Sequence, residues 1–211
     1  MKETQILALV MVMIVVSFLG FVVENAWLAV TKGFIDNRNM CLPFLVGYGF
    51  AMLAIYILLG TPGELTLLGR RLSIRKKLVK KLLYFLLVVM CICVGEILLG
   101  KLVEYTCGFY WWDYSRLPMH ITRYTSIPTS MGFSVLVTAF MDNCFMPLIN
   151  KFAVWDYEKL RLVAVSFMLL LTGDFIYNAY RMYKDRKMQP RWKFDTTHTK
   201  AYRLLNSSKL R

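Results

Sequence analysis

Long apolar stretches separated by short polar segments constrain this chain more than any other feature of its sequence. A helix that crosses a bilayer needs about 20 mostly apolar residues, because lipid offers no hydrogen-bond partner to an open backbone. Five segments approach that length: residues 5–31, 41–60, 79–105, 121–149 and 158–182. The sequence therefore predicts an all-α fold, an integral membrane helical bundle of about five transmembrane helices.

Composition supports the same class. Hydrophobic residues make up 57% of the 211-residue chain and charged residues only 18%, whereas a soluble domain carries about 25% charged residues. The connections between the apolar segments are short. We therefore expect a single transmembrane helical domain over residues 1–182, followed by a basic polar C-terminal tail over residues 183–211.

The net charge of +13 is concentrated in two blocks. Residues 70–81 hold seven basic side chains and residues 184–211 hold nine. Basic blocks beside membrane spans contact anionic lipid headgroups or fix topology, so we expect membrane lipids rather than nucleic acid as partners. The expected location is the cell membrane, with a multi-pass arrangement.

The two basic blocks conflict with the positive-inside rule. That rule places both blocks in the cytoplasm, but three predicted spans separate them and put them on opposite sides. Either the rule fails here or one of the last three segments is re-entrant. We expect five spans with the loop of residues 61–81 in the cytoplasm.

Motifs for cofactors are absent from the sequence. The chain has five cysteines and two histidines without zinc-ligand spacing, and it contains no G-x-x-x-x-G-K-[ST] motif for ATP. G-x-S-x-G and H-E-x-x-H are also missing. We therefore expect no metal, no cofactor, and neither serine hydrolase nor zinc protease chemistry, and the sequence leaves open whether the protein is an enzyme.

Two acidic residues lie inside predicted spans, where charged side chains are expensive and usually functional. Glu24 lies seven residues before the end of the first span, about 10 Å below the membrane edge, and Glu96 nine residues before the end of the third, about 13 Å below it. Both spans run in the same direction. Both carboxylates are therefore expected near the same membrane face.

Helical spacing puts small residues beside these acids. Gly20 precedes Glu24 by four residues, and Glu96, Gly100 and Glu104 follow one another at the same spacing. Small residues let helices approach closely, so these faces should point inward. After each acid-bearing helix the chain continues with Gly-Phe and an acid ("GFIDNR" and "GFYWWDYS"), a weak internal echo.

Other polar residues are expected at the same face. Carboxylates close together in a low dielectric would not both ionise easily, so one would have a raised pKa or would pair with Arg38 or Arg123. The alternative is a structural polar network, and for Asp113 with its tryptophans an interfacial aromatic belt. No catalytic residue is assigned; the substrate- or ion-binding candidates are Glu24, Asn37, Arg38, Tyr48, Glu96, Glu104, Trp112, Asp113, Tyr114, Arg123 and Asp174.

Four stretches together resemble a known family: "GFVVENAW", "KGFIDNRNMCLPFLVGYGF", "GEILLGKLVEY" and "GFYWWDYSRLP". They are similar to the ABC-transporter type IV family, the CmpB-like multi-pass membrane proteins, over residues 20–141. Asn39 and Leu42 depart from the family pattern, which tends to have glycine there. The matching positions are Gly20, Glu24, Asn37, Arg38, Pro43, Tyr48, Gly49, Glu96, Glu104, Trp112, Asp113, Tyr114 and Ser115.

The resemblance implies a permease subunit that works with a separate ATPase. In that hypothesis the acids bind a cation or the basic part of a substrate, or relay protons. The alternative is a membrane-embedded enzyme or binding protein that acts on a lipid or lipid-linked substrate, with the acids as general acid or base. The sequence does not decide between a homo-oligomer and a complex with an ATPase.

Overall fold

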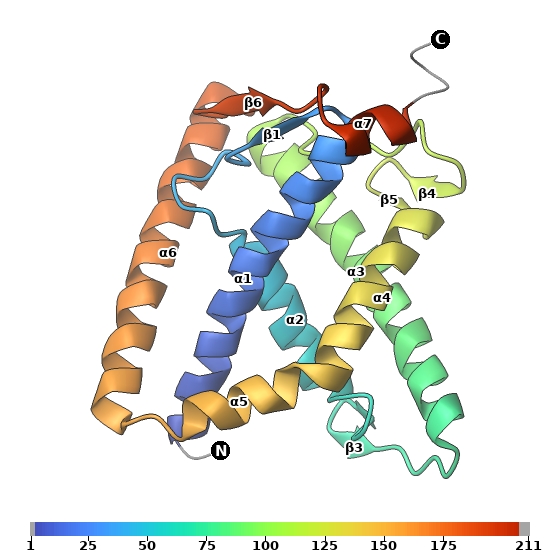
Figure 1. The fold of residues 1–211 in the computed structure, drawn as a ribbon, viewed down its shortest axis with the longest axis vertical. Helices are drawn as coiled ribbons and strands as arrows, with labels where there is room; N and C mark the ends of the chain where they lie inside the picture. The colour runs from blue at the N-terminus through green and yellow to red at the C-terminus, as the bar shows by residue number, and fades with distance from the viewer. Residues whose placement is uncertain (1–2, 207–211) are drawn as a thin grey trace.

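The fold was analysed in a computed structural model that describes residues 3–206, and it confirms the helical membrane class (Figure 1). Three of the described helices are long and apolar enough to cross a membrane. A fourth candidate span is a pair of helices bent by 45°. A further apolar helix of 14 residues is shorter. In chain order they are α1 (Glu3–Thr31), α2 (Val46–Leu59), α3 (Lys77–Cys107), the bent pair α4 (Ile127–Asn143) and α5 (Phe145–Ala153), and α6 (Tyr157–Asp185).

The helices alternate in direction between two ends of the molecule. Figure 1 shows α1, α3 and α6 rising from the end at which α1 begins, here called the lower end, while α2 and α4 return to it. Helix α5 lies across the lower end. The hairpin of β2 (Thr66–Leu67) and β3 (Arg70–Arg71) is also at the lower end; β1 (Phe34–Asp36), β4 (His120–Thr122), β5 (Thr125–Ser126), β6 (Lys193–Asp195) and α7 (Lys200–Leu205) are at the upper end.

The second helix begins five residues later than the predicted span. Residues 41–45 are not helical, because their backbone N–H groups bond elsewhere: Cys41 and Leu42 donate to the Asp174 carboxylate, and Leu45 donates to the Ser17 carbonyl. Pro43 also disfavours a helical conformation at the residue before it. The chain therefore enters the bundle as an extended segment, and only then starts α2.

The fourth predicted span is wrong at its start and broken near its end. His120–Thr122 pairs with Thr125–Ser126 as an antiparallel hairpin, and α4 begins at Ile127 with Pro128 in its first turn. Helix α4 ends at Asn143, and α5 continues at 45° to it. Pro147 explains the break, since its ring clashes with the carbonyl four residues earlier and it has no N–H to donate.

An apolar core joins the lower halves of the helices. Val12, Tyr84, Phe145 and Leu160, from α1, α3, α5 and α6, are all fully buried. Many leucines of α3 and α6 point outward instead; Leu98 of α3, for example, is 64% exposed, as expected for a helix that faces lipid.

The C-terminal tail packs on the upper end. Strand β6 pairs antiparallel with β1, with Ile35 opposite Phe194. Helix α7 packs on α1, and the Asn206 amide donates to the Val30 carbonyl at 3.0 Å. The tail and the basic β2–β3 hairpin therefore lie at opposite ends of the molecule (Figure 1).

Candidate functional site

Glu24 of α1 is bound by two residues of the following loop and helix. Its Oε1 lies 3.0 Å from Nη2 of Arg38, and its Oε2 accepts a hydrogen bond from the Tyr48 hydroxyl. Arg38 Nη1 lies 3.6 Å from a second carboxylate, that of Asp36. Two carboxylates therefore share one guanidinium, whose side chain is only 11% exposed.

Local hydrogen bonds set the position of Arg38. The Asp36 carboxylate accepts the Arg38 backbone N–H at 2.8 Å, which closes a short turn, and Asp36 in turn donates its own N–H to Asn25 of α1. Arg38 and Asn39 both have positive φ, at 51° and 65°. Asparagine tolerates this left-handed conformation better than most residues do, so Asn39 fits a position where glycine would also fit.

Asn37 stabilises the loop that carries Arg38 through hydrogen bonds to backbone groups. Its amide donates to the Met40 carbonyl at 2.5 Å, and its Oδ1 accepts the N–H of Arg191 at 3.0 Å. Asn39 Oδ1 similarly accepts the N–H of Gln189. The C-terminal tail is thus bonded directly to the loop that carries Arg38.

Tyr48 reaches Glu24 because α1 and α2 meet closely. A Cβ atom on Gly20 would lie 2.4 Å from Cγ of the Tyr48 ring, so only glycine leaves room for it. One turn away, a Cβ on Gly49 would lie 2.4 Å from the Ser17 hydroxyl. Two glycines, one on each helix, therefore bring Tyr48 against α1.

Glu96 of α3 is bound by hydroxyl groups. Its Oε2 accepts hydrogen bonds from Thr125 Oγ1 at 2.5 Å and from Ser130 Oγ at 2.9 Å. Both hydroxyl residues are fully buried and lie 2.9 Å from each other. Within residues 3–206, no basic side chain forms a salt bridge with Glu96.

Tyr114 lies within electrostatic range of both intramembrane acids. Burial, followed by the negative charges of Glu96 and Glu24, raises the pKa of the Tyr114 phenol above its ordinary range. The Tyr114 backbone N–H donates to the Arg123 carbonyl at 2.7 Å, which joins its loop to the β4–β5 hairpin. The loop that carries Tyr114 thus lies near both acid-bearing helices, α1 and α3.

Glu104 forms a separate group nearer the upper end of α3. It accepts a hydrogen bond from the Tyr124 hydroxyl, and this bond raises the pKa of Tyr124 to about 12. Trp112 donates its indole N–H to the Tyr124 carbonyl at 2.7 Å. The guanidinium of Arg123 lies over the Tyr110 ring, 4.1 Å from its centroid.

Asp113 and Asp174 lie in different surroundings. Asp113 is exposed and accepts the Ser115 backbone N–H at 2.9 Å, which holds the pKa of its carboxyl below the usual range. Asp174 of α6 binds the extended segment before α2 and accepts a hydrogen bond from Asn178 at 2.7 Å. Asp174 thus links α6 to that segment through hydrogen bonds.

Sequence reasoning missed four residues that contact the candidate site residues. Asp36, Tyr124, Thr125 and Ser130 touch Arg38, Glu104 or Glu96. Ser130 does have a sequence signal, because Ser130, Ser134, Thr138 and Asp142 recur every fourth residue and form one polar stripe on a helix. The other three lie in turns or short strands, whose contacts depend on tertiary structure.

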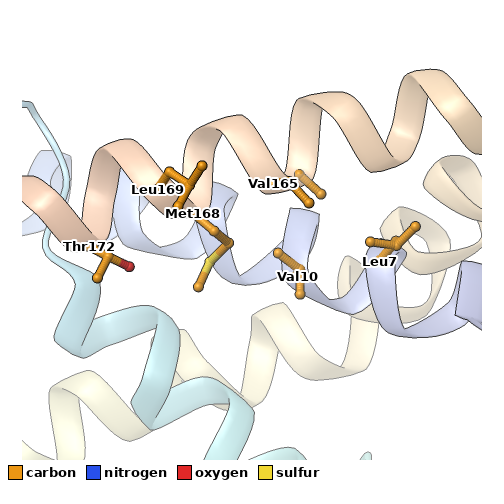
Figure 2. Close-up of a pocket in the computed structure, with 7 residues that line it drawn as sticks. Leu7, Val10, Val165, Met168, Leu169 and Thr172 are labelled. Carbon is orange, nitrogen blue, oxygen red and sulfur yellow. The ribbon is translucent and has the colours of Figure 1, made fainter.

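A shallow apolar groove of about 220 Å³ lies between α1 and α6 (Figure 2). Figure 2 shows Leu7 and Val10 on one side, with Val165, Met168 and Leu169 on the other. None of its lining residues is titratable. Among residues 3–206, no group of three or more His, Cys, Asp or Glu side chains is placed to hold a metal ion.

A protein-family model covers most of the chain. The family model described as "Putative ABC-transporter type IV" matches residues 11–179, which confirms the resemblance found in the sequence. No curated protein and no solved structure matches the chain.

Proposed function

Because this chain belongs to the family described as Putative ABC-transporter type IV, we propose that it is the membrane-spanning subunit of a transporter in the cell membrane. In this proposal, Glu24 and Glu96 form a site for a cation, either a proton or the cationic group of a substrate. The chain has no ATP-binding motif of the G-x-x-x-x-G-K-[ST] type, so a separate ATPase subunit would supply the energy.

The charge balance of the cluster carries the proposal. Three carboxylates, Glu24, Asp36 and Glu96, lie in or beside the helical bundle, and Arg38 is the guanidinium that pairs with two of them. Glu96 has hydroxyl partners and, within residues 3–206, no salt bridge. An excess of negative charge in a low dielectric is relieved by a proton or by another bound cation.

A lipid-directed function has one supporting feature, the apolar groove between α1 and α6. Its lining is almost entirely apolar and would suit an acyl chain. Val10 in the groove precedes Glu24 by fourteen residues on α1, which is about 21 Å along a helix. The groove has no general acid or base of its own, so transport remains the function that we propose.

Ligand-linked stability tests the proposal without requiring the ATPase. A cation that binds only the folded protein raises the free energy of unfolding by RT ln(1 + [L]/Kd). This is about 2.7 kcal/mol when the cation concentration is one hundred times Kd. Purified protein in detergent would be melted at constant ionic strength with sodium, potassium, methylammonium or choline chloride, and over a range of pH. The wild-type Tm should rise with at least one cation or on acidification.

Three variants assign that effect to residues. Glu24→Gln and Glu96→Gln should lose the rise in Tm, and Glu158→Gln, which changes an exposed acid of α6, should keep it. A wild-type Tm that responds to none of the cations or to pH would contradict the proposal. An equal response in all four proteins would contradict it as well.

A further inference from the structure

Two helices of the bundle carry the same three-residue arrangement. On α1, Tyr48 lies across Gly20 and donates its hydroxyl to Glu24, four residues further on. On α3, Tyr124 lies across Gly100 and donates its hydroxyl to Glu104, again four residues further on. A Cβ on Gly20 would lie 2.4 Å from Cγ of the Tyr48 ring, and a Cβ on Gly100 would lie 2.3 Å from Cδ1 of the Tyr124 ring.

The two arrangements also agree at the residue that follows each tyrosine. This residue contacts the same helix about one turn before the glycine. Gly49, which follows Tyr48, lies against Ser17, three residues before Gly20. Thr125, which follows Tyr124, bonds to Glu96, four residues before Gly100. In both cases the tyrosine thus brings its neighbour onto the same helix, about one turn below the glycine.

The direction of the elements also agrees. Helices α1 and α3 both rise to the upper end, and α2 and α4 both return from it (Figure 1). Each tyrosine lies close to the start of a returning helix, Tyr48 in the first turn of α2 and Tyr124 three residues before α4. The Gly-Phe echoes at residues 33–34 and 108–109 follow the two rising helices.

From these relationships we infer that Tyr124 is a positioning residue for Glu96, with α1–α2 and α3–α4 as two copies of one contact arrangement. Transport proteins are often built from such repeats, with the binding site between them. Here Glu24 comes from the first copy and Glu96 from the second. The role given to Tyr124 rests on the proposed function, because it concerns the geometry of the cation site.

Tyr124 acts through Thr125. The Tyr124 ring fills the space above Gly100, its hydroxyl bonds Glu104, and its carbonyl accepts the Trp112 indole N–H. These three contacts fix the backbone from which Thr125 donates to Glu96. The two copies differ in this contact. The first has Ser17 and Gly49 at the positions where the second has the acid Glu96 and the hydroxyl donor Thr125.

Substitutions at two glycines of the same helix test the role of Tyr124. Gly100→Ala must displace Tyr124, whereas Gly95→Ala adds a methyl group at a position with no neighbouring atom within 4 Å. Tyr124→Phe keeps the ring on Gly100 and removes only the hydrogen bond to Glu104. If Gly100→Ala yields no folded protein, Tyr124→Phe alone decides the outcome.

The readout is the infrared band of the Glu96 carboxyl group, identified by subtracting the spectrum of Glu96→Gln. Its frequency reports the hydrogen bonds that the group accepts, so it should shift in Gly100→Ala and Tyr124→Phe and stay unchanged in Gly95→Ala. An unchanged Glu96 band in Tyr124→Phe would overturn the inference.

This readout separates the inference from the proposed function. A shifted Glu96 band in a protein whose Tm responds to no cation or pH would retain Tyr124 as a positioning residue and reject the cation site. An unchanged band in a protein with cation-dependent Tm would reject the inference and leave the site in place.

Discussion

Arg38 and Glu24 form an ion pair that ties the loop after β1 to the last quarter of α1. The atoms Nη2 and Oε1 lie 3.0 Å apart, and the two side chains are only 11% and 24% exposed. A pair this far from water loses much of its hydration, so it is expensive to break by removing one partner. The pair therefore fixes the loop against α1.

Removing the guanidinium should destabilise the protein. Arg38→Met leaves Glu24 and Asp36 without their shared counter-charge, which should lower the free energy of unfolding by about 3 kcal/mol. Adding Glu24→Gln to Arg38→Met should restore part of that loss, because one uncompensated charge is gone. Denaturant titration in mixed micelles measures both effects, and equal stability of Arg38→Met and wild type would contradict the account.

The close contact of α1 with Tyr48 predicts a contrast between two glycines. Gly20→Ala forces a methyl group into the Tyr48 ring and should cost about 1–3 kcal/mol, as overpacking does. Gly47→Ala, on the opposing helix, meets no atom within 4 Å and should be neutral or stabilising by up to about 1 kcal/mol. Unfolding of the two variants in parallel checks this, and equal losses would show that Gly20 is not a contact site.

Asn39 combines a left-handed backbone with a hydrogen bond to the tail. Asn39→Gly should lose only the bond from Gln189, about 1 kcal/mol. Asn39→Ala should lose that bond and also strain the backbone at φ 65°, a further cost of about 1 kcal/mol. The Tm should therefore be highest for the wild type, lower for Asn39→Gly and lowest for Asn39→Ala. An Asn39→Ala variant as stable as Asn39→Gly would contradict the left-handed conformation.

Tyr124 should titrate at unusually high pH. Its pKa of about 12 comes first from the hydrogen bond to Glu104. Since a raised folded-state pKa favours the protonated folded form, this contribution is present below pH about 10 and is lost as the pH rises through about 12. Glu104→Gln should move the pKa of Tyr124 back toward 10, visible as tyrosinate absorbance after subtraction of Tyr124→Phe; an unmoved titration would exclude the carboxylate as its cause.

Periodicity and span counting predicted the features that depend on hydropathy alone. Glu24 and Glu96 were expected near one membrane face because their helices run in the same direction, and α1 and α3 do run to the same end (Figure 1). Arg38 was one of two arginines expected to pair with an acid, and it lies beside Glu24.

Features that depend on contacts distant in sequence were not predictable. The late start of α2 at Val46 results from donation of backbone N–H groups to Asp174, more than 130 residues away in the chain. The tail is held by Asn37 and Asn39, whose side-chain amide oxygens accept hydrogen bonds from its backbone N–H groups. Hydropathy carries no signal for such bonds, so the tail was described only by its charge.

The central claim is that Glu24 and Glu96 belong to one site, and a double-mutant cycle tests it most directly. The free energies of unfolding of wild type, Glu24→Gln, Glu96→Gln and the double variant would be compared at one pH and ionic strength. Groups in one electrostatic network couple by about 0.5–3 kcal/mol, whereas independent groups add within about 0.3–0.5 kcal/mol. The account predicts a coupling free energy above about 0.5 kcal/mol; additive effects, with a coupling below about 0.3 kcal/mol, would contradict it.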